Sequence, residues 1–223
     1  MSALINRKLG GKSGGKRRPA GYRARAKAET RERILEAALA LFQKKGFEGT
    51  TTKAIARNAQ VAEGTIFNYF KTKEDIALFF FEKEAEHVIA SFENGKRLKN
   101  APLDEKLFAL IQRQLEYIAP YERFIGSVIL QAFQPSSKLS PFSLESQSLQ
   151  VRYLTFVQKL FKEAEEKGEI GPVSWWTPQA FWVYYIGILF YWLHDTSRNK
   201  EHTLAFLDRS LKIGIAMLKK GMF

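Results

Sequence analysis

Apolar residues recur every three or four positions along most of this 223-residue chain, which is the spacing of helices with one buried face. The strict alternation of a half-buried strand does not occur in the sequence. The spacing predicts nine helices, over residues 26–45, 52–58, 63–70, 73–94, 103–118, 122–133, 142–167, 178–194 and 200–220. Gly46 follows the first helix as a left-handed cap, and Pro120 ends the fifth. The predicted fold class is therefore all-α.

The segment from Thr50 to Lys73 is the most informative part of the pattern. It reads as two short helices joined by a tight turn, and a threonine hydroxyl, Thr51 or Thr52, can cap the first helix. The inward face of the second helix carries Ile66 and Phe70, and its outward face carries Phe67, Asn68 and Tyr69. A second helix presented in this way is the geometry of a helix-turn-helix motif, which inserts that helix into the major groove of DNA.

Residues 29–80 resemble the DNA-binding region of the TetR (tetracycline-repressor-like) family of transcriptional regulators. The matching residues are Arg33 to Ala38, Leu41, Phe42, Gly46, Phe47, Thr50 to Thr52, Ile55, Ala56, Val61, Gly64 to Phe67, Tyr69, Phe70 and Lys73. The chain departs from the family at Ala59-Gln60, where the turn commonly contains glycine, and at Asn68, which bears on base preference. The resemblance implies a three-helix DNA-binding domain over residues 26–72, with its motif at about 51–70. A larger helical domain for ligand binding and dimerisation would follow over residues 73–223.

The resemblance places the DNA contacts on and around the second helix of the motif. The predicted DNA-binding residues are Thr51, Thr52, Lys53, Glu63, Gly64, Thr65, Phe67, Asn68, Tyr69 and Lys73. Asn68 can pair with adenine, and Phe67 can contact a thymine methyl group. The threonine hydroxyls at the helix start and the Lys73 ammonium suit phosphates. Two alternatives stay open: one of Phe67 and Tyr69 packs against a neighbouring helix, and Thr52 acts only as a cap.

The formal charge of +12 is concentrated at the N-terminus. Residues 1–33 contain eleven Lys and Arg but only two Glu, so this segment carries +9 of the total. Glycines and Pro19 predict a disordered basic arm over residues 1–25. Such an arm can lie along DNA phosphates or in a minor groove, and the alternative is a solvated tail.

Aromatic residues crowd the segment from Trp175 to Trp192 and cannot all lie on one stripe of a helix. The resemblance implies that the last two helices pair with their copies in a homodimer, and an intrachain core is the alternative. It also implies a ligand pocket among the middle helices, for a small hydrophobic or aromatic effector. The predicted pocket residues, each of which would equally suit a dry core, are Phe108, Ile111, Tyr117, Phe124, Val128, Phe133, Phe156, Phe181 and Tyr185.

Several kinds of chemistry have no support in the sequence. There is no cysteine, which excludes disulfides and Cys-ligated zinc, and the three histidines match no metal motif. For His194 a helix-terminal hydrogen bond is the expected role. No catalytic triad, phosphate loop or carboxylate pair stands out, so no enzyme activity, cofactor or metal is expected. The apolar run over residues 180–193 is shorter than a bilayer span, and a cytoplasmic protein without a membrane segment is expected.

These observations predict a sequence-specific, DNA-binding transcriptional regulator. The expected mechanism is a repressor dimer released from an inverted-repeat operator by a small hydrophobic effector, with the fourth helix transmitting the change. A non-specific basic DNA-binding protein is one alternative, and its affinity would depend on salt and ignore sequence. A helical ligand-binding or enzymatic domain with an incidental basic tail is the other.

Overall fold

The computed structural model describes residues 20–95, 98–134, 137–140 and 143–220, and every regular element in them is helical. The α-helices are α1 (Ala20–Lys45), α2 (Thr52–Asn58), α3 (Glu63–Phe67), α4 (Lys73–Glu93), α5 (Leu103–Ile118), α6 (Glu122–Ala132), α7 (Gln147–Glu166), α8 (Thr177–His194) and α9 (Glu201–Lys219). Three short 3₁₀ turns lie between these helices in the described residues: η1 (Leu98–Asn100), η2 (Ala119–Tyr121) and η3 (Arg198–Lys200). The predicted all-α class is confirmed.

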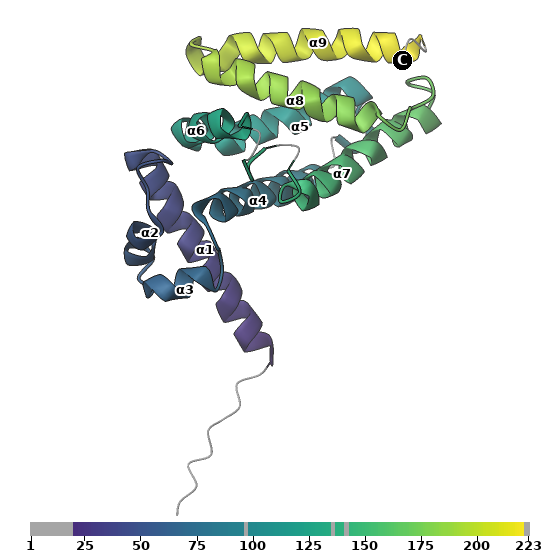
Figure 1. The fold of residues 1–223 in the computed structure, drawn as a ribbon. Helices are drawn as coiled ribbons and strands as arrows, with labels where there is room; N and C mark the ends of the chain where they lie inside the picture. The colour runs from purple at the N-terminus through teal and green to yellow at the C-terminus, as the bar shows by residue number, and fades with distance from the viewer. Residues whose placement is uncertain (1–19, 96–97, 135–136, 141–142, 221–223) are drawn as a thin grey trace, which may run out of the picture.

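The helices form a small unit and a larger one (Figure 1). Helices α1, α2 and α3 lie together at one end of the molecule, and α1 extends beyond α3 toward the N-terminus. Helix α4 leads from this unit into the larger one, where it packs against α5 and α7. Helices α8 and α9 form an outer layer on the side away from α2 and α3. The DNA-binding motif and the last two helices thus lie at opposite ends of the molecule.

Two predicted helix boundaries in the smaller unit were wrong. Helix α1 begins at Ala20 rather than residue 26, because residues 22–33 are nearly all good helix formers such as Arg, Ala, Lys and Glu. Helix α3 ends at Phe67 rather than residue 70, because its last turn tightens into i to i+3 bonds such as Asn68 N to Thr65 O at 3.1 Å. The predicted disordered arm over residues 1–25 was wrong for residues 20–25, which belong to α1, and residues 1–19 lie outside the described residues.

Helix α7 begins at Gln147 rather than at residue 142, which lies outside the described residues. Serine hydroxyls hold the preceding connection in turns. Ser143 Oγ donates to Lys138 O at 2.7 Å, and Ser146 Oγ donates to Ser140 O at 2.9 Å. Such side-chain bonds to the backbone compete with helix formation, so the helix starts only after them.

A cluster of buried phenylalanine rings joins the two units. The Phe124 ring of α6 lies 4.9 Å from the Phe42 ring of α1, 6.0 Å from Phe47 and 5.5 Å from Phe80 of α4, between ring centroids. All four side chains are buried. Because α1, α4 and α6 meet at Phe124, a shift of α6 would be transmitted to α1 and α4, the helices on either side of α2 and α3.

The start of α4 is fixed by a capping box. Thr72 Oγ1 accepts from Asp75 N at 3.3 Å, and Asp75 Oδ2 accepts from Thr72 N at 3.0 Å and from Lys71 N at 2.9 Å. Thr72 is thus the N-cap of α4, which begins at Lys73 as predicted. Gly46, with φ of 78°, caps α1 as predicted. These local signals fix where α1 ends and α4 begins, on either side of the DNA-binding motif.

Asp195 joins the C-terminal end of α8 to α9. Its carboxylate accepts hydrogen bonds from the backbone N–H groups of Ser197 and Thr203, both at 2.8 Å. It also accepts from the hydroxyl groups of the same two residues. Burial acts to raise the pKa of Asp195, but these hydrogen bonds outweigh it and lower the pKa below its usual range. The neighbouring His194 makes the expected helix-terminal bond, from Nδ1 to Phe190 O at 2.8 Å. The two outer helices are therefore held together at this turn.

Candidate functional site

The motif over α2 and α3 is built on three buried side chains, Ile55, Ile66 and Phe70. Thr51 caps α2, with its Oγ1 accepting from Ala54 N at 3.2 Å. Gln60 lies in the left-handed region, with φ of 56°. It is in the turn between α2 and α3, which commonly contains glycine in the family that the sequence resembles. The two helices are thus held in a fixed relation by packing, one cap and one sharp turn.

The outward face of α3 is the candidate DNA-reading surface. Phe67 is 51% exposed, and Glu63, Gly64 and Asn68 are also exposed. Tyr69, by contrast, is half-buried against the core, so it is the member of the aromatic pair that packs inward. Thr65 is half-buried on the same helix. Of the three residues predicted on the outward face, Phe67 and Asn68 are therefore exposed and Tyr69 is not.

Lys73 makes contacts within the protein. Its Nζ donates to Phe47 O at 3.0 Å and lies 3.5 Å from Glu48 O and 3.4 Å from Glu48 Oε2. The same ammonium lies 4.6 Å from the centroid of the Phe47 ring. Lys73 therefore secures the connection between α1 and α2 from the start of α4.

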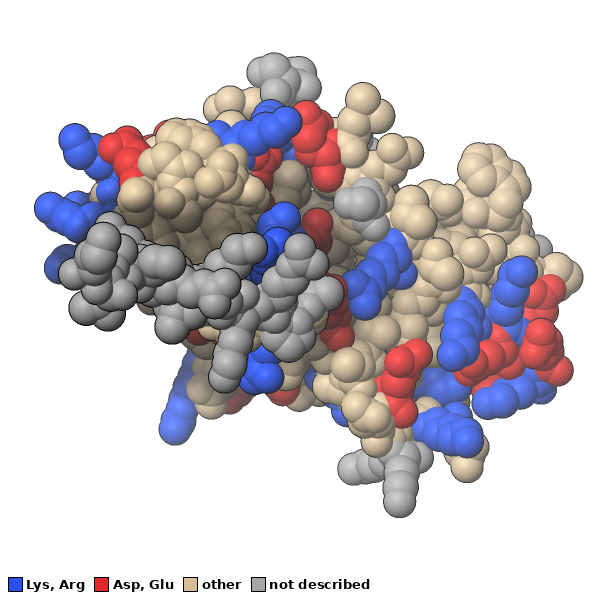
Figure 2. All heavy atoms as spheres, turned by 90° about the horizontal axis from the view of Figure 1, so that it is seen from below, with Lys and Arg blue, Asp and Glu red and all other residues tan. Residues whose placement is uncertain are grey.

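Other cations around the motif are exposed to solvent, although Arg25 Nε donates to Glu29 Oε1 at 3.1 Å. On α2, Lys53 and Arg57 are exposed, and on the first turns of α1 the exposed cations are Arg23, Arg25 and Lys27. Figure 2 shows the molecule from below, with Lys and Arg gathered at its left edge, on the side where α2 lies in Figure 1. A basic face beside an exposed short helix is what phosphate binding requires.

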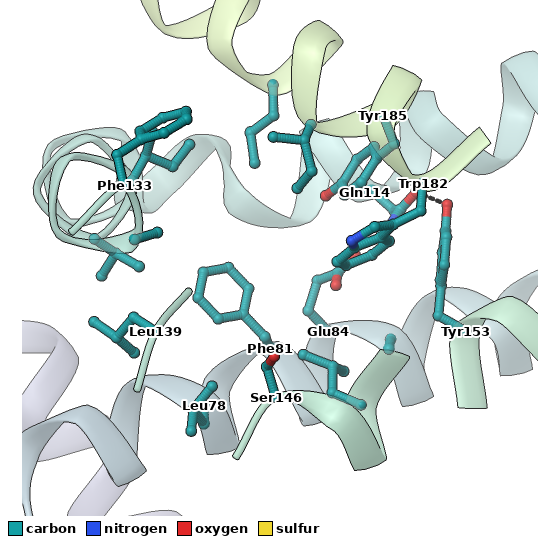
Figure 3. A pocket seen from close by; sticks show the side chains of 17 residues that line it. Leu78, Phe81, Glu84, Gln114, Phe133, Leu139, Ser146, Tyr153, Trp182 and Tyr185 are labelled. Carbon is teal, nitrogen blue, oxygen red and sulfur yellow. Dashed lines mark hydrogen bonds between the residues drawn. The ribbon is translucent and has the colours of Figure 1, made fainter. Parts of the chain in front are cut away.

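The larger unit contains a cavity of about 100 Å³ between α4, α6, α7 and α8 (Figure 3). Its walls are almost entirely apolar, with Leu78, Phe81 and Ala85 contributed by α4. Leu139 and Ser146, from the connection before α7, complete the wall. Helix α4 therefore lies directly along the cavity.

The predicted pocket residues fall into three groups. Val128, Phe133 and Tyr185 line this cavity. Phe108 and Phe181 line two other surface depressions, and the rest are core or interface residues, namely Ile111, Tyr117, Phe124 and Phe156. The packing of Phe124 explains why it is unavailable, because its ring is enclosed by the three other phenylalanines.

Most of the residues that line the cavity were not among the predicted ones, and Glu84 is the charged residue that the sequence reasoning missed. It is only 4% exposed and belongs to α4. Burial raises its pKa to about 8, although a hydrogen bond with Gln114 acts in the opposite direction. A signal was present in the sequence, because Glu84 continues the i, i+4 series of Ile76 and Phe80 and interrupts an otherwise apolar stripe.

These features define a class: a helix-turn-helix protein whose larger helical domain encloses a small apolar cavity. Residues 34–78 match the family model described as "Bacterial regulatory proteins, tetR family", and residues 106–223 match "Tetracyclin repressor-like, C-terminal domain". The chain belongs to the TetR family of bacterial regulatory proteins and is a DNA-binding transcriptional regulator. Among the described residues, no helix is long and apolar enough to cross a membrane.

Individual relatives agree with this assignment. The chain is 28% identical over 137 residues to the fatty acid metabolism regulator protein of Bacillus subtilis, covering 61% of this chain and 69% of that one. It is 38% identical over 77 residues to the transcriptional repressor KstR of Rhodococcus jostii, covering 34% of each chain. A structure of FadR from Bacillus subtilis in complex with stearoyl-CoA superposes with a TM-score of 0.63 at 23% identity, covering 85% of this chain and 98% of that one. A regulator from Syntrophomonas wolfei superposes with a TM-score of 0.68 at 23% identity, covering 85% of this chain and 96% of that one.

Proposed function

We propose that the protein is a cytoplasmic repressor that leaves its operator when an apolar effector fills the cavity. The observation that carries the proposal is the position of α4. One face of α4 lines the cavity through Leu78 and Phe81, while Phe79, between them in sequence, lies 5.5 Å from the Phe70 ring behind the motif. A single helix thus contacts both the effector site and the DNA-binding domain.

The DNA-reading roles follow from exposure. We assign base contacts to Phe67 and Asn68, with Thr65, Glu63 and Gly64 close to the groove floor, and Tyr69 supporting the end of α3. Phosphates would bind at Thr51, Thr52 and Lys53, at the N-terminal end of α2 where backbone N–H groups are available. Lys73 would serve mainly by holding the α1–α2 connection, given its contacts there.

A homodimer through α8 and α9 is the second part of the proposal. These helices and the residues just before α8 leave large apolar side chains exposed at Trp175, Val183, Phe190, Tyr191, Phe206 and Ile213. A monomer seldom exposes so many large apolar side chains on two neighbouring helices, so a second copy that covers them is the simplest explanation. The two recognition helices would then read an inverted repeat in successive major grooves, about 34–36 Å apart.

The size of the cavity supports a mechanism based on expansion. At about 100 Å³ it is smaller than the roughly 300–1,000 Å³ of sites that hold drug-sized ligands. An effector of that size must therefore separate α4 from α6 and α8. Since a ligand shifts an equilibrium only by its differential affinity for two states, the expanded state would be the one that releases DNA. The relative that regulates fatty acid metabolism makes molecules with an acyl chain the first candidates.

The proposal is tested with an operator obtained by selection and labelled for fluorescence anisotropy. Acyl-chain compounds are titrated into the protein–operator complex. The proposal predicts that an effector releases the operator from the wild-type protein. It also predicts that the same compound fails to release the operator from Ala85→Phe, in which the new side chain fills the cavity. If the compound releases DNA equally well from the Ala85→Phe protein, the cavity is not the effector site.

A further inference from the structure

The cavity has one polar end, and two polar atoms there lack a hydrogen-bond partner. Glu84 Oε1 and Trp182 Nε1 are both buried and both unpartnered. Glu84 comes from α4 and Trp182 from α8, and both residues line the cavity. Figure 3 shows their side chains at the same end, away from Phe133 and Leu139. An unpaired buried polar atom costs free energy, so this end is suited to a ligand group that pairs with both.

The neighbours of Glu84 leave its Oε1 without a partner, so this oxygen can carry the carboxyl proton and donate it to a ligand. Tyr153 Oη donates to Gln114 Oε1 at 2.9 Å, so the Gln114 amide has its N–H groups left for Glu84. The Trp182 ring lies 5.4 Å from Tyr153 and 5.8 Å from Tyr185, between centroids. These two tyrosines are the other titratable groups among the described residues that line the cavity, and burial raises the pKa of each, so they stay neutral. Tyr117 of α5, outside the cavity lining, also interacts electrostatically with Glu84, and burial raises its pKa as well.

No Lys, Arg or His is among the described residues that line the cavity. A buried carboxyl group without a cation is most stable as the neutral acid, and the raised pKa of Glu84 agrees. The protonated carboxyl group has an O–H to donate, and the indole has an N–H to donate. Two donors without a partner therefore lie at the same end of an apolar cavity.

We infer that the effector has an apolar body and one neutral oxygen acceptor, a carbonyl or hydroxyl group, which binds between the Glu84 carboxyl group and the Trp182 indole. This inference rests on the proposed function only in taking the cavity as the effector site. An ammonium ligand fits less well, because it offers no acceptor to the indole and requires Glu84 to give up its proton to solvent. A carboxylate ligand would bring a charge into an apolar cavity that supplies no cation.

The test uses four probes with eight carbons each: methyl hexyl ketone, octylamine, octanoate and octane. Binding is measured by calorimetry with the wild-type protein and with Glu84→Gln, Glu84→Met and Trp182→Phe. The ketone is expected to bind most tightly. Glu84→Gln keeps an N–H donor and should leave ketone affinity within about threefold, whereas Glu84→Met and Trp182→Phe each remove a donor and should weaken it about tenfold.

The pH dependence separates the ligand classes. Affinity of the wild-type protein for the ketone should be constant from pH 6 to 7.5 and fall above about pH 8, as Glu84 loses its proton, and Glu84→Gln should abolish that fall. Octylamine binding that strengthens with pH and disappears in Glu84→Gln would instead assign a cationic effector. Equal affinity for octane and the ketone, or no binding by any probe to a folded protein, would also overturn the inference. Operator binding, measured separately, shows whether the DNA-binding function stands when the ligand assignment fails.

Discussion

Replacing Phe124 by leucine tests whether this residue ties the two units together. The substitution keeps an apolar side chain in a fully buried position but removes the ring that lies within 6.0 Å of Phe42, Phe47 and Phe80. Aromatic pairs contribute about 0.5–1.5 kcal/mol each beyond their buried area, so three pairs place the loss of unfolding free energy at about 3 kcal/mol. The measurement is urea unfolding, with the slope checked for two-state behaviour.

Phe161→Leu is the matched control. Phe161 is also buried but lies within the larger unit, where its ring contacts Phe181 at 5.9 Å. One ring pair predicts a loss of about 1 kcal/mol. Phe124→Leu should in addition reduce the effect of an effector on operator affinity, and Phe161→Leu should not. Equal losses of stability in the two variants, with unchanged coupling in both, would refute the assignment of Phe124 as the link between the units.

Three further predictions concern charge and assembly. Glu84 stays protonated in the folded protein up to about pH 8 but ionises near its ordinary pKa when unfolded. As the pH rises from about 5 to 8, the free energy of unfolding should therefore fall by about 1.4 kcal/mol per pH unit. In Glu84→Gln, the free energy measured by urea unfolding should change much less over the same pH range. Lys73→Met should lower the melting temperature and leave the salt dependence of operator affinity unchanged. Lys53→Met should reduce the slope of that salt dependence by about one and leave the melting temperature unchanged. The reverse pattern would make Lys73 the phosphate contact. Val183→Glu should convert a dimer to monomers in sedimentation at micromolar concentration, and an unchanged mass would place the interface elsewhere.

The local features of the DNA-binding domain were predictable because short-range chemistry fixes them. The bounds of α2, the start of α4 at Thr72 and the cap at Gly46 follow from hydroxyl capping and from the conformational freedom of glycine. The end of α3 was not predictable to the residue, because its last turn tightens under tertiary packing of Phe70. The orientation of Phe67 toward solvent followed from helical periodicity alone.

The cavity was harder to predict, because its composition depends on which faces of distant helices meet. Val128 and Tyr185 reach it, whereas Phe124, with the same apolar character, is taken up by the contact with α1 and α4. Ser146 enters the wall from an irregular connection whose path periodicity does not describe. Glu84 was detectable in principle as a carboxylate on an apolar stripe, but only the structure shows that it lines the cavity and that its Oε1 is buried without a hydrogen-bond partner.

The most direct measurement is selection of bound sequences from a pool of random duplex DNA at about physiological salt, where non-specific phosphate binding is weak. A dimeric repressor predicts enrichment of an inverted repeat whose half-sites lie about one helical turn, or a multiple of it, apart. Binding that falls steeply with salt and enriches no sequence would contradict this account and would favour a general DNA-coating role for the basic N-terminal segment.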